Sequence, residues 1–304
     1  MKCLHPILAR EWQDRFDPKT GTYKKVRTNS FHYVPCGSCV ACLAEKRNQW
    51  TYRLQKERSA SDYSFFLTLT YDEDHVPIKI KDGLLYFVFD KKHVQDYLKR
   101  VRFMVSKINK DLICRYYCVS EYGKKTLRPH YHMQFFVKND HFLRYQKNIC
   151  QILEKEWPYG YFQRKSTDDA NIHYVTKYCI KSLEDLDTKC IDPPFILCSK
   201  RPYLGESAEN LISKQSIQDK VYLNGFSMTT PRIYSEKLHI NKSSSISDSL
   251  DPRLSESLYH GLIEEYRRTH SYFSLKEFTT WYQSRIDRFE ADAVRRQLTR
   301  NEKL

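Results

Sequence analysis

The segment 116–137 constrains the fold of this chain more than any other part of its sequence. Two runs rich in β-branched and aromatic residues flank a polar stretch that contains a glycine and a proline, a pattern typical of a β-hairpin. Because side chains alternate between the two faces of a strand, His130 and His132 lie on the same face of the second run. Two imidazoles separated by one residue therefore point the same way and can share one metal ion.

Glu121, near the end of the first run, is the expected third ligand. Paired residues of antiparallel strands have a constant index sum, and any odd sum near this turn places Glu121 on the histidine face. Pairing of Glu121 with His130 or His132 then gives two nitrogen ligands and one carboxylate, with coordination positions left open for substrate oxygens. This mixed set suits Mg²⁺ or Mn²⁺ better than zinc. The alternative is a surface hairpin with two solvated histidines.

The charge of the chain points to a polyanionic partner. The sequence has 304 residues, a formal net charge of +14 and a pI of about 9.2. Neutralising phosphates releases condensed counterions, so this excess of cations favours nucleic acid. The 23 tyrosines and 16 phenylalanines supply flat surfaces on which unpaired bases can stack. No run is apolar enough for a membrane span or a signal peptide, which predicts a cytosolic protein with reduced or metal-bound cysteines.

Three of the ten cysteines are spaced as metal ligands. Cys36, Cys39 and Cys42 have Cys-x2-Cys-x2-Cys spacing, and Cys3 can complete a tetrahedral site for structural zinc. His5 is the alternative fourth ligand. An iron–sulfur cluster fits less well, because a fourth nearby cysteine and a following proline are absent. The remaining alternative is a set of reduced cysteines that bind nothing.

A predicted helix from Thr167 to about Leu186 carries a second group of chemically active residues. Its apolar residues cluster on one arc at 100° per residue, which marks the face toward the core. Two Tyr-x-x-Lys units, four residues apart, lie on the opposite arc: Tyr174, Lys177, Tyr178 and Lys181. Two phenols and two ammonium groups are thus stacked on a face directed away from the core. A solvated basic face is the alternative interpretation.

The remaining patterns predict an α+β protein. Helices are expected at 40–60, 90–107 with Asp90 as its N-cap, and 141–157; strands are expected at 65–71, 84–89 and 161–164, and a loop at 72–82. The predicted domains are a Cys-rich N-terminal segment with its helix (1–60), a core (61–240), a Ser-rich linker (241–252) and a helical C-terminal region (253–304).

Four motifs together resemble a known family. His130 and His132 flanking one hydrophobic residue, with Glu121 on the preceding strand, resemble motif II of the HUH endonucleases, which nick single-stranded DNA. The surrounding residues, Glu-Tyr-Gly and then Arg-Pro-His-Tyr-His, are most similar to the replication initiator proteins of gokushovirus-type microviruses. Residues 65–71 resemble motif I, residues 174–181 resemble motif III, and the 36–42 cysteine segment also matches. These motifs follow the family's order over about two thirds of the chain.

The resemblance implies a fold and an activity. The fold is a central antiparallel sheet with flanking helices, of the ferredoxin-like or RRM-like kind. The activity is rolling-circle replication, started by a metal-dependent nick in single-stranded origin DNA inside the bacterial host cytoplasm. Tyr174 and Tyr178 alternate as nucleophiles, with Tyr174 expected to act first, and the 5′-phosphotyrosine bond permits later rejoining. Lys177 and Lys181 assist, and host helicase and polymerase are further expected partners. Residues 200–205, Lys-Arg-Pro-Tyr-Leu-Gly, resemble the region after motif III.

Two alternatives remain open at this stage. A transposase or plasmid relaxase of the HUH superfamily has the same chemistry and a different biological task. A non-catalytic zinc-containing nucleic-acid-binding protein fits the charge and the cysteines. That second alternative gives no role to the two histidines opposite Glu121 or to the tandem Tyr-x-x-Lys.

Overall fold

The computed structural model describes residues 7–18, 20–123, 126–181, 192–240 and 264–270, together with residues 277, 280, 281, 284 and 288. The chain divides into two compact units, one formed by Met1–Lys46 with Ser235–Leu304 and the other by Arg47–Tyr234. No helix within the described ranges is long and apolar enough to cross a membrane. The domain boundaries expected at residues 60, 240 and 252 stay predictions.

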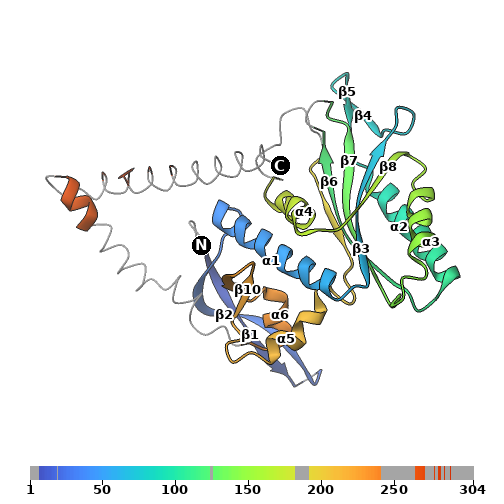
Figure 1. Cartoon of the computed structure of the whole chain (residues 1–304). Coiled ribbons are helices and arrows are strands. Elements are labelled where there is room, and N and C mark those ends of the chain that lie inside the picture. The colour runs from blue at the N-terminus through green and yellow to red at the C-terminus, as the bar shows by residue number, and fades with distance from the viewer. Residues whose placement is uncertain are drawn as a thin grey trace. The chain divides into compact units, whose positions relative to one another are not determined.

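The unit Arg47–Tyr234 is built on a five-stranded antiparallel sheet (Figure 1). The strand order is β8-β3-β7-β6-β9, and every neighbouring pair is antiparallel. The strands are β3 (Tyr63–Tyr71), β6 (Ile113–Tyr122), β7 (Pro129–Lys138), β8 (Gly160–Ser166) and β9 (Ile196–Cys198). The central strand β7 follows β6 through the predicted hairpin, so the histidine strand lies in the middle of the sheet. This confirms the α+β class with a central antiparallel sheet.

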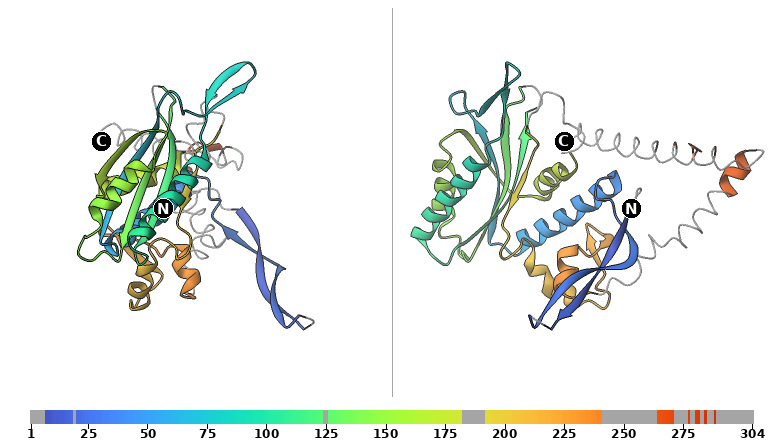
Figure 2. Two further views of the ribbon diagram at one scale, coloured as in Figure 1. Left: turned by 90° about the vertical axis from the view of Figure 1, so that its right-hand side faces the viewer. Right: turned by 180° about the vertical axis from the view of Figure 1, so that it is seen from behind.

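Two helices, α2 (Lys91–Ile108) and α3 (Gln146–Lys155), cover one face of the sheet (Figure 2). The Asp90 carboxylate caps α2 by accepting hydrogen bonds from the backbone N–H groups of Lys92 and His93. The inward stripe of α2 is fully apolar and buried against alternate residues of β3 and β7. Its members are Val94, Tyr97, Leu98, Val101 and Val105. Burial of this face supplies the main core of the unit.

The opposite face of the sheet is covered by α4 (Asp169–Lys181) and by the part of α1 (Val40–Ser59) that belongs to this unit. Leu54 of α1 and Ile172 and Val175 of α4 are fully buried against Phe66 and other residues of β3, β6 and β7. The apolar arc predicted for the second Tyr-x-x-Lys helix is thus the one that packs on the sheet. As a result, α4 lies on the same face of the sheet as the two histidines.

A buried ionic cluster joins α1 to the β6–β7 hairpin. Glu57 is completely buried, and its Oε1 lies 3.3 Å from Nε of Arg115 and 2.8 Å from Nζ of Lys138. Its Oε2 accepts a hydrogen bond from the backbone N–H of Gly205 at 2.7 Å. One carboxylate therefore neutralises two cations and holds a loop that is 148 residues away in the sequence.

Substituting Glu57 with Gln is expected to lower the free energy of unfolding by about 3–5 kcal/mol, because Arg115 and Lys138 then lose their counterion in a dry site. Chemical denaturation monitored by circular dichroism measures the change. Glu154→Gln, on the exposed side of α3, is the matched control and should change stability by less than about 0.5 kcal/mol. Equal stabilities of the two variants would contradict the assigned role.

Shorter elements complete the described chain. In the larger unit they are β4 (Ile78–Lys81), β5 (Leu84–Phe87), η1 (Glu206–Ala208), α5 (Glu209–Ser213), β10 (Lys220–Leu223) and β11 (Phe226–Thr229). In the other unit, β1 (Ile7–Asp17) pairs with β2 (Thr22–Val34), and α6 (Arg232–Lys237) spans the division between units. Residues 264–269 are helical. The linker 241–252 and most of the predicted C-terminal helices lie outside the described residues.

Two secondary-structure predictions were wrong. The loop expected at 72–82 contains β4, which pairs with β5 as a hairpin. The helix expected from residue 141 begins only at Gln146, because the Asp140 carboxylate accepts hydrogen bonds from the N–H groups of Arg144 and Tyr145. Those bonds form a turn in place of a first helical turn, since a side chain that satisfies nearby N–H groups competes with helix formation.

Candidate active site

The register of the central strands brings the predicted metal ligands together. Glu121 of β6 pairs with His130 of β7, which is one of the two predicted pairings. On the other side of β7, His130 pairs with Thr70 and His132 pairs with Thr68 of β3. Because cross-strand partners share a face, the carboxylate and both imidazoles lie on the α4 side of the sheet.

The donor atoms of these residues fit one divalent ion. Oε2 of Glu121 lies 3.3 Å from Nε2 of His130 and 3.0 Å from Nε2 of His132. Two ligands at about 2.1 Å from one ion and at right angles to each other are about 3 Å apart. All three donor atoms lie within 4.8 Å of one another. The geometry is therefore compatible with Mg²⁺, Mn²⁺ or zinc, and it does not identify which one.

Contacts of the other ring nitrogens set the orientation of the imidazoles. Nδ1 of His130 lies 3.3 Å from the carbonyl oxygen of Arg128, which can only accept, so Nδ1 carries the proton and Nε2 is left with its lone pair. Nδ1 of His132 lies 3.2 Å from Oγ1 of Thr68, and the ring stacks parallel to Phe66 at 5.5 Å between centroids. These contacts aim both Nε2 atoms at Glu121.

His132 is held in the neutral form that a metal ligand requires. Burial is the main cause that lowers the pKa of His132, and the positive charges of His130 and Lys177 act in the same direction. The hydrogen bond to Glu121 opposes this shift without reversing it. A lowered pKa means that protons compete less with a metal ion for Nε2 at neutral pH.

Helix α4 places the phenol of Tyr174 in the same cluster. Its hydroxyl donates a hydrogen bond to Oε2 of Glu121 at 3.0 Å and lies 3.3 Å from Nε2 of His132. The ammonium group of Lys177, one helical turn on, lies 4.0 Å from the centroid of the Tyr174 ring. Only part of the predicted motif is described at side-chain level: the backbones of Tyr178 and Lys181 belong to α4, and their side chains lie outside the described residues.

A row of residues that was not singled out in the sequence crosses the sheet beside this cluster. Glu121, His130, Thr70 and Tyr161 are successive cross-strand partners on β6, β7, β3 and β8. Tyr161 is 67% exposed at the edge of the sheet. Its residue type carries no signal of this position, because only the register of β8 on β3 places it in line with His130.

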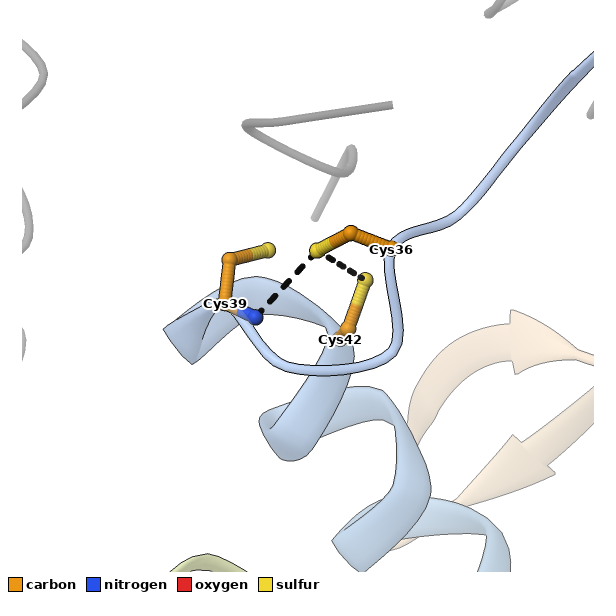
Figure 3. A group of neighbouring side chains, drawn as sticks. All are labelled: Cys36, Cys39 and Cys42. Atoms are coloured by element: carbon orange, nitrogen blue, oxygen red, sulfur yellow. Dashed lines mark hydrogen bonds between the residues drawn. The ribbon is translucent and has the colours of Figure 1, made fainter. Parts of the chain in front are cut away.

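The three central cysteines form a second cluster, in the other unit (Figure 3). Sγ of Cys36 lies 3.9 Å from Sγ of Cys42, and all three sulfur atoms lie within 4.8 Å of one another. Sulfurs at about 2.3 Å from a tetrahedral zinc are about 3.8 Å apart, so the spacing fits a zinc ion. Gly37 has φ of +78°, a conformation that side chains disfavour, and this turn brings Cys36 back over the start of α1.

The first of these cysteines is also prepared to be a thiolate. Burial raises the pKa of Cys36, but hydrogen bonds from the backbone N–H groups of Cys39 and Ser38 outweigh it and lower the pKa to about 6. The cluster lies at the N-terminal end of α1, where the helix dipole also favours negative sulfur. The two alternatives for the fourth ligand, Cys3 and His5, lie outside the described residues.

Comparison with known proteins gives a consistent set of relatives. A family of replication-associated proteins, described by the name ORF2, matches residues 64–183, which contain every part of the His, Glu and Tyr cluster. The central part of the chain is related to phage replication-associated proteins. No solved structure matches the chain.

Three curated phage proteins show how far the relation extends. Replication-associated protein ORF4 of Chlamydia phage 1 is 28% identical over 71% of this chain and 56% of its own length. Replication-associated protein VP4 of Bdellovibrio phage phiMH2K is 28% identical over 60% and 59%, and replication-associated protein ORF2 of Spiroplasma virus 4 is 25% identical over 60% and 61%. The resemblance to microvirus replication proteins is confirmed, and the chain spans about three fifths of the length of these relatives.

Proposed function

We propose that this chain is a rolling-circle replication initiator that nicks single-stranded phage DNA through Tyr174. The observation that carries the proposal is the hydrogen bond from the Tyr174 hydroxyl to Glu121 within the His–Glu cluster. A phenol held against a divalent-metal site by a helix on the same face of the sheet is the arrangement that tyrosine transesterification needs. The printed names of the relatives support replication as the biological task.

His130, His132 and Glu121 are the residues that would hold the metal of the nicking site. When bound, Mg²⁺ or Mn²⁺ supplies charge that polarises the phosphate and stabilises the leaving oxygen. The chain's part is to aim these three donors at one point and to leave one side of the point open to the Tyr174 hydroxyl. The short strand-to-helix distances place the phenol where a phosphate bound at the cluster is within reach.

The reaction conserves the energy of the phosphodiester. Oη of Tyr174 forms a bond to phosphorus as the bond from phosphorus to the 3′ oxygen breaks. The phenol proton passes to water, and the released 3′ oxygen takes up a proton, so no further reactant is consumed. The product is a 5′-phosphotyrosine that a free 3′ hydroxyl can later attack to rejoin the strand. The ammonium of Lys177 beside the ring favours the phenolate that this attack requires.

Alternation between two tyrosines is part of the proposal. Tyr174 and Tyr178 are about 6 Å apart along the axis of α4, at about 1.5 Å per residue. Each has a lysine three residues further on, Lys177 and Lys181. A phosphate at the cluster is reached by either phenol after a small shift of the helix or the strand, so Tyr174 initiates and Tyr178 cleaves the regenerated origin.

Substrate DNA is expected to cross the sheet along the row that ends at Tyr161. Strands are about 4.8 Å apart, so Tyr161 lies about 10 Å from His130, and its exposed ring offers a stacking surface to a base near the scissile phosphate. Tyr161→Ala is therefore expected to weaken binding of a nick-spanning oligonucleotide about tenfold, as measured by fluorescence anisotropy. Tyr222→Ala, which removes an equally exposed tyrosine from β10, should change affinity less than twofold, and equal effects would contradict this path.

Cys36, Cys39 and Cys42 are proposed to bind one structural zinc ion, with Cys3 or His5 as the fourth ligand. Elemental analysis of purified, untagged protein is expected to find one zinc per chain. Cys36→Ser should lose that zinc, whereas Cys150→Ser, outside the cluster, should retain it. Wild-type protein that contains neither zinc nor iron would refute a metal role for these cysteines.

The activity itself is tested by covalent trapping. Protein is incubated with labelled single-stranded origin DNA and Mn²⁺ and then separated on a denaturing gel. A labelled band at the mass of protein plus DNA is expected, and EDTA should prevent it. Cleavage without a protein–DNA adduct would exclude tyrosine transesterification and would favour a different nuclease mechanism.

Two other functions share part of this support. A transposase or relaxase of the HUH superfamily uses the same chemistry, and the printed names of the relatives favour replication over it. A non-catalytic zinc-containing DNA-binding protein leaves the contact of Tyr174 with Glu121 and His132 without a purpose. Host helicase and polymerase remain predicted partners.

A further inference from the structure

A groove of about 650 Å³ follows the β9 edge of the central sheet, apart from the candidate active site. Its floor is formed by strand residues that include Tyr116 and Leu197, and its sides by α2 and residues 199–202. The residues that line it include five cations and no carboxylate: Lys91, Arg102, Arg115, Lys200 and Arg201. Its volume is typical of ligand sites, and its charge selects an anion.

One side of the groove is the Lys-Arg-Pro-Tyr-Leu-Gly segment, which the core holds rigidly. Arg115 is 4% exposed, forms an ion pair with Glu57, and donates a hydrogen bond to the carbonyl oxygen of Pro202. At the end of the segment Gly205 has φ of +80°, and a Cβ there would lie 2.6 Å from Oη of Tyr234. The segment is therefore locked at both ends, and it presents Lys200 and Arg201 at a fixed place.

The other four cations are available to a ligand. Lys91, Arg102, Lys200 and Arg201 are exposed, and none forms an ion pair with a carboxylate of the described residues. Lys91 faces the ring of Phe195 at 5.8 Å, and Arg102 faces that of Tyr116 at 5.2 Å. Cations gathered without counterions repel one another, so a bound polyanion would relieve that repulsion and release counterions.

The spacing of these cations indicates the size of the ligand. Lys91 and Arg102 are eleven residues apart on α2, which returns them to the same helix face about 16 Å apart. A single phosphate or a mononucleotide cannot contact both, whereas a strand with several phosphates can. The floor offers apolar side chains and the Tyr116 ring, which can pack against unpaired bases but not against bases inside a duplex.

We infer that this groove binds a second segment of single-stranded DNA, separate from the segment at the nick. Tyr116 and Glu121 point to opposite faces of β6 and are about 16 Å apart along the strand. The groove therefore holds DNA without touching the cleavage cluster, and its binding does not depend on the proposed nicking reaction. In an initiator it would keep the enzyme on the strand while the 3′ end is extended.

The test compares two triple variants of the full chain that remove the same charge. The groove variant carries Arg102→Ala, Lys200→Ala and Arg201→Ala, and the control carries Lys110→Ala, Lys147→Ala and Lys155→Ala, all at exposed positions outside the groove. Binding of a labelled single-stranded oligonucleotide without origin sequence is measured in EDTA at several salt concentrations. Melting temperatures verify that both variants fold; if the groove variant does not, Lys200→Glu alone takes its place.

The groove variant is expected to bind at least tenfold more weakly, and its slope of log affinity against log salt is expected to fall by about 2, because three phosphate contacts at about 0.7 each are lost. The control should lose less than threefold. Iodouracil in the oligonucleotide should cross-link to Tyr116 in wild-type protein. Equal weakening of both variants, cross-links elsewhere, or equal competition by a mononucleotide would overturn the inference. Adduct formation on a short, saturating nick-spanning oligonucleotide should be unchanged in the groove variant, so failure of the nicking proposal is observed separately.

Discussion

Replacing His130 with alanine is expected to reduce nicking at least about a thousandfold, while the affinity for single-stranded DNA changes less than threefold. The expected loss reflects the several kcal/mol that a correctly held divalent ion contributes to the transition state, and each ~1.4 kcal/mol is a factor of ten in rate. His130 supplies one of only two imidazole donors in the cluster. Affinity is retained because most binding energy comes from cations that contact phosphates.

His141→Ala is the matched control for this substitution. His141 is 75% exposed at its side chain and lies 3.1 Å from Asp62, outside the Glu121 cluster. Nicking by this variant should stay within twofold of wild type. Substantial nicking by His130→Ala at saturating Mn²⁺ would remove His130 from the ligand set, and a parallel loss of DNA binding would assign it a role in binding instead.

Replacing Tyr174 with phenylalanine is expected to abolish the first covalent adduct, with a loss of at least about ten thousandfold in initial nicking. The ring contacts of Tyr174 with Phe66 and His132 are kept, so only the hydroxyl that contacts Glu121 is removed. No other group of the chain replaces an attacking oxygen at the same atom. Tyr222→Phe, on exposed β10, should leave adduct formation unchanged.

Tyr178→Phe separates a two-tyrosine mechanism from a one-tyrosine mechanism. Under alternation this variant forms the first adduct normally and fails at the second cleavage, when the regenerated origin must be cut. If Tyr174→Phe alone removes all activity and Tyr178→Phe completes both steps, alternation is excluded. Adduct formation by the double variant would exclude α4 as the source of the nucleophile.

The strand elements that position the site were predictable because their patterns are local. Alternation over residues 130–137 fixed the face of both histidines, and the index-sum rule fixed the face of Glu121 before any register was known. The helical arc of Ile172 and Val175 likewise fixed the side of α4 that packs on the sheet. In each case a strong apolar periodicity agreed with the tertiary structure.

Other features depend on contacts between segments far apart in the sequence. Strand β9 has three residues and no alternation of its own, and its place beside β6 rests on pairing near Tyr117 and on hydrogen bonds of Ser120 with Phe195. The position of Tyr161 depends on the register of β8. The burial of Glu57 between two cations gave no signal, because a charged residue in a basic helix normally faces solvent.

The most direct test of tyrosine transesterification through Tyr174 is the mass of the peptide that carries the DNA. Trypsin cuts after Lys177, so Tyr174 and Tyr178 fall in different peptides, 166–177 and 178–181. After a single round of nicking of labelled origin DNA with Mn²⁺, followed by trypsin and nuclease digestion, the nucleotide-modified peptide is expected to be 166–177. A modified peptide from any other part of the chain, or a cleaved DNA with no modified peptide, would contradict the account.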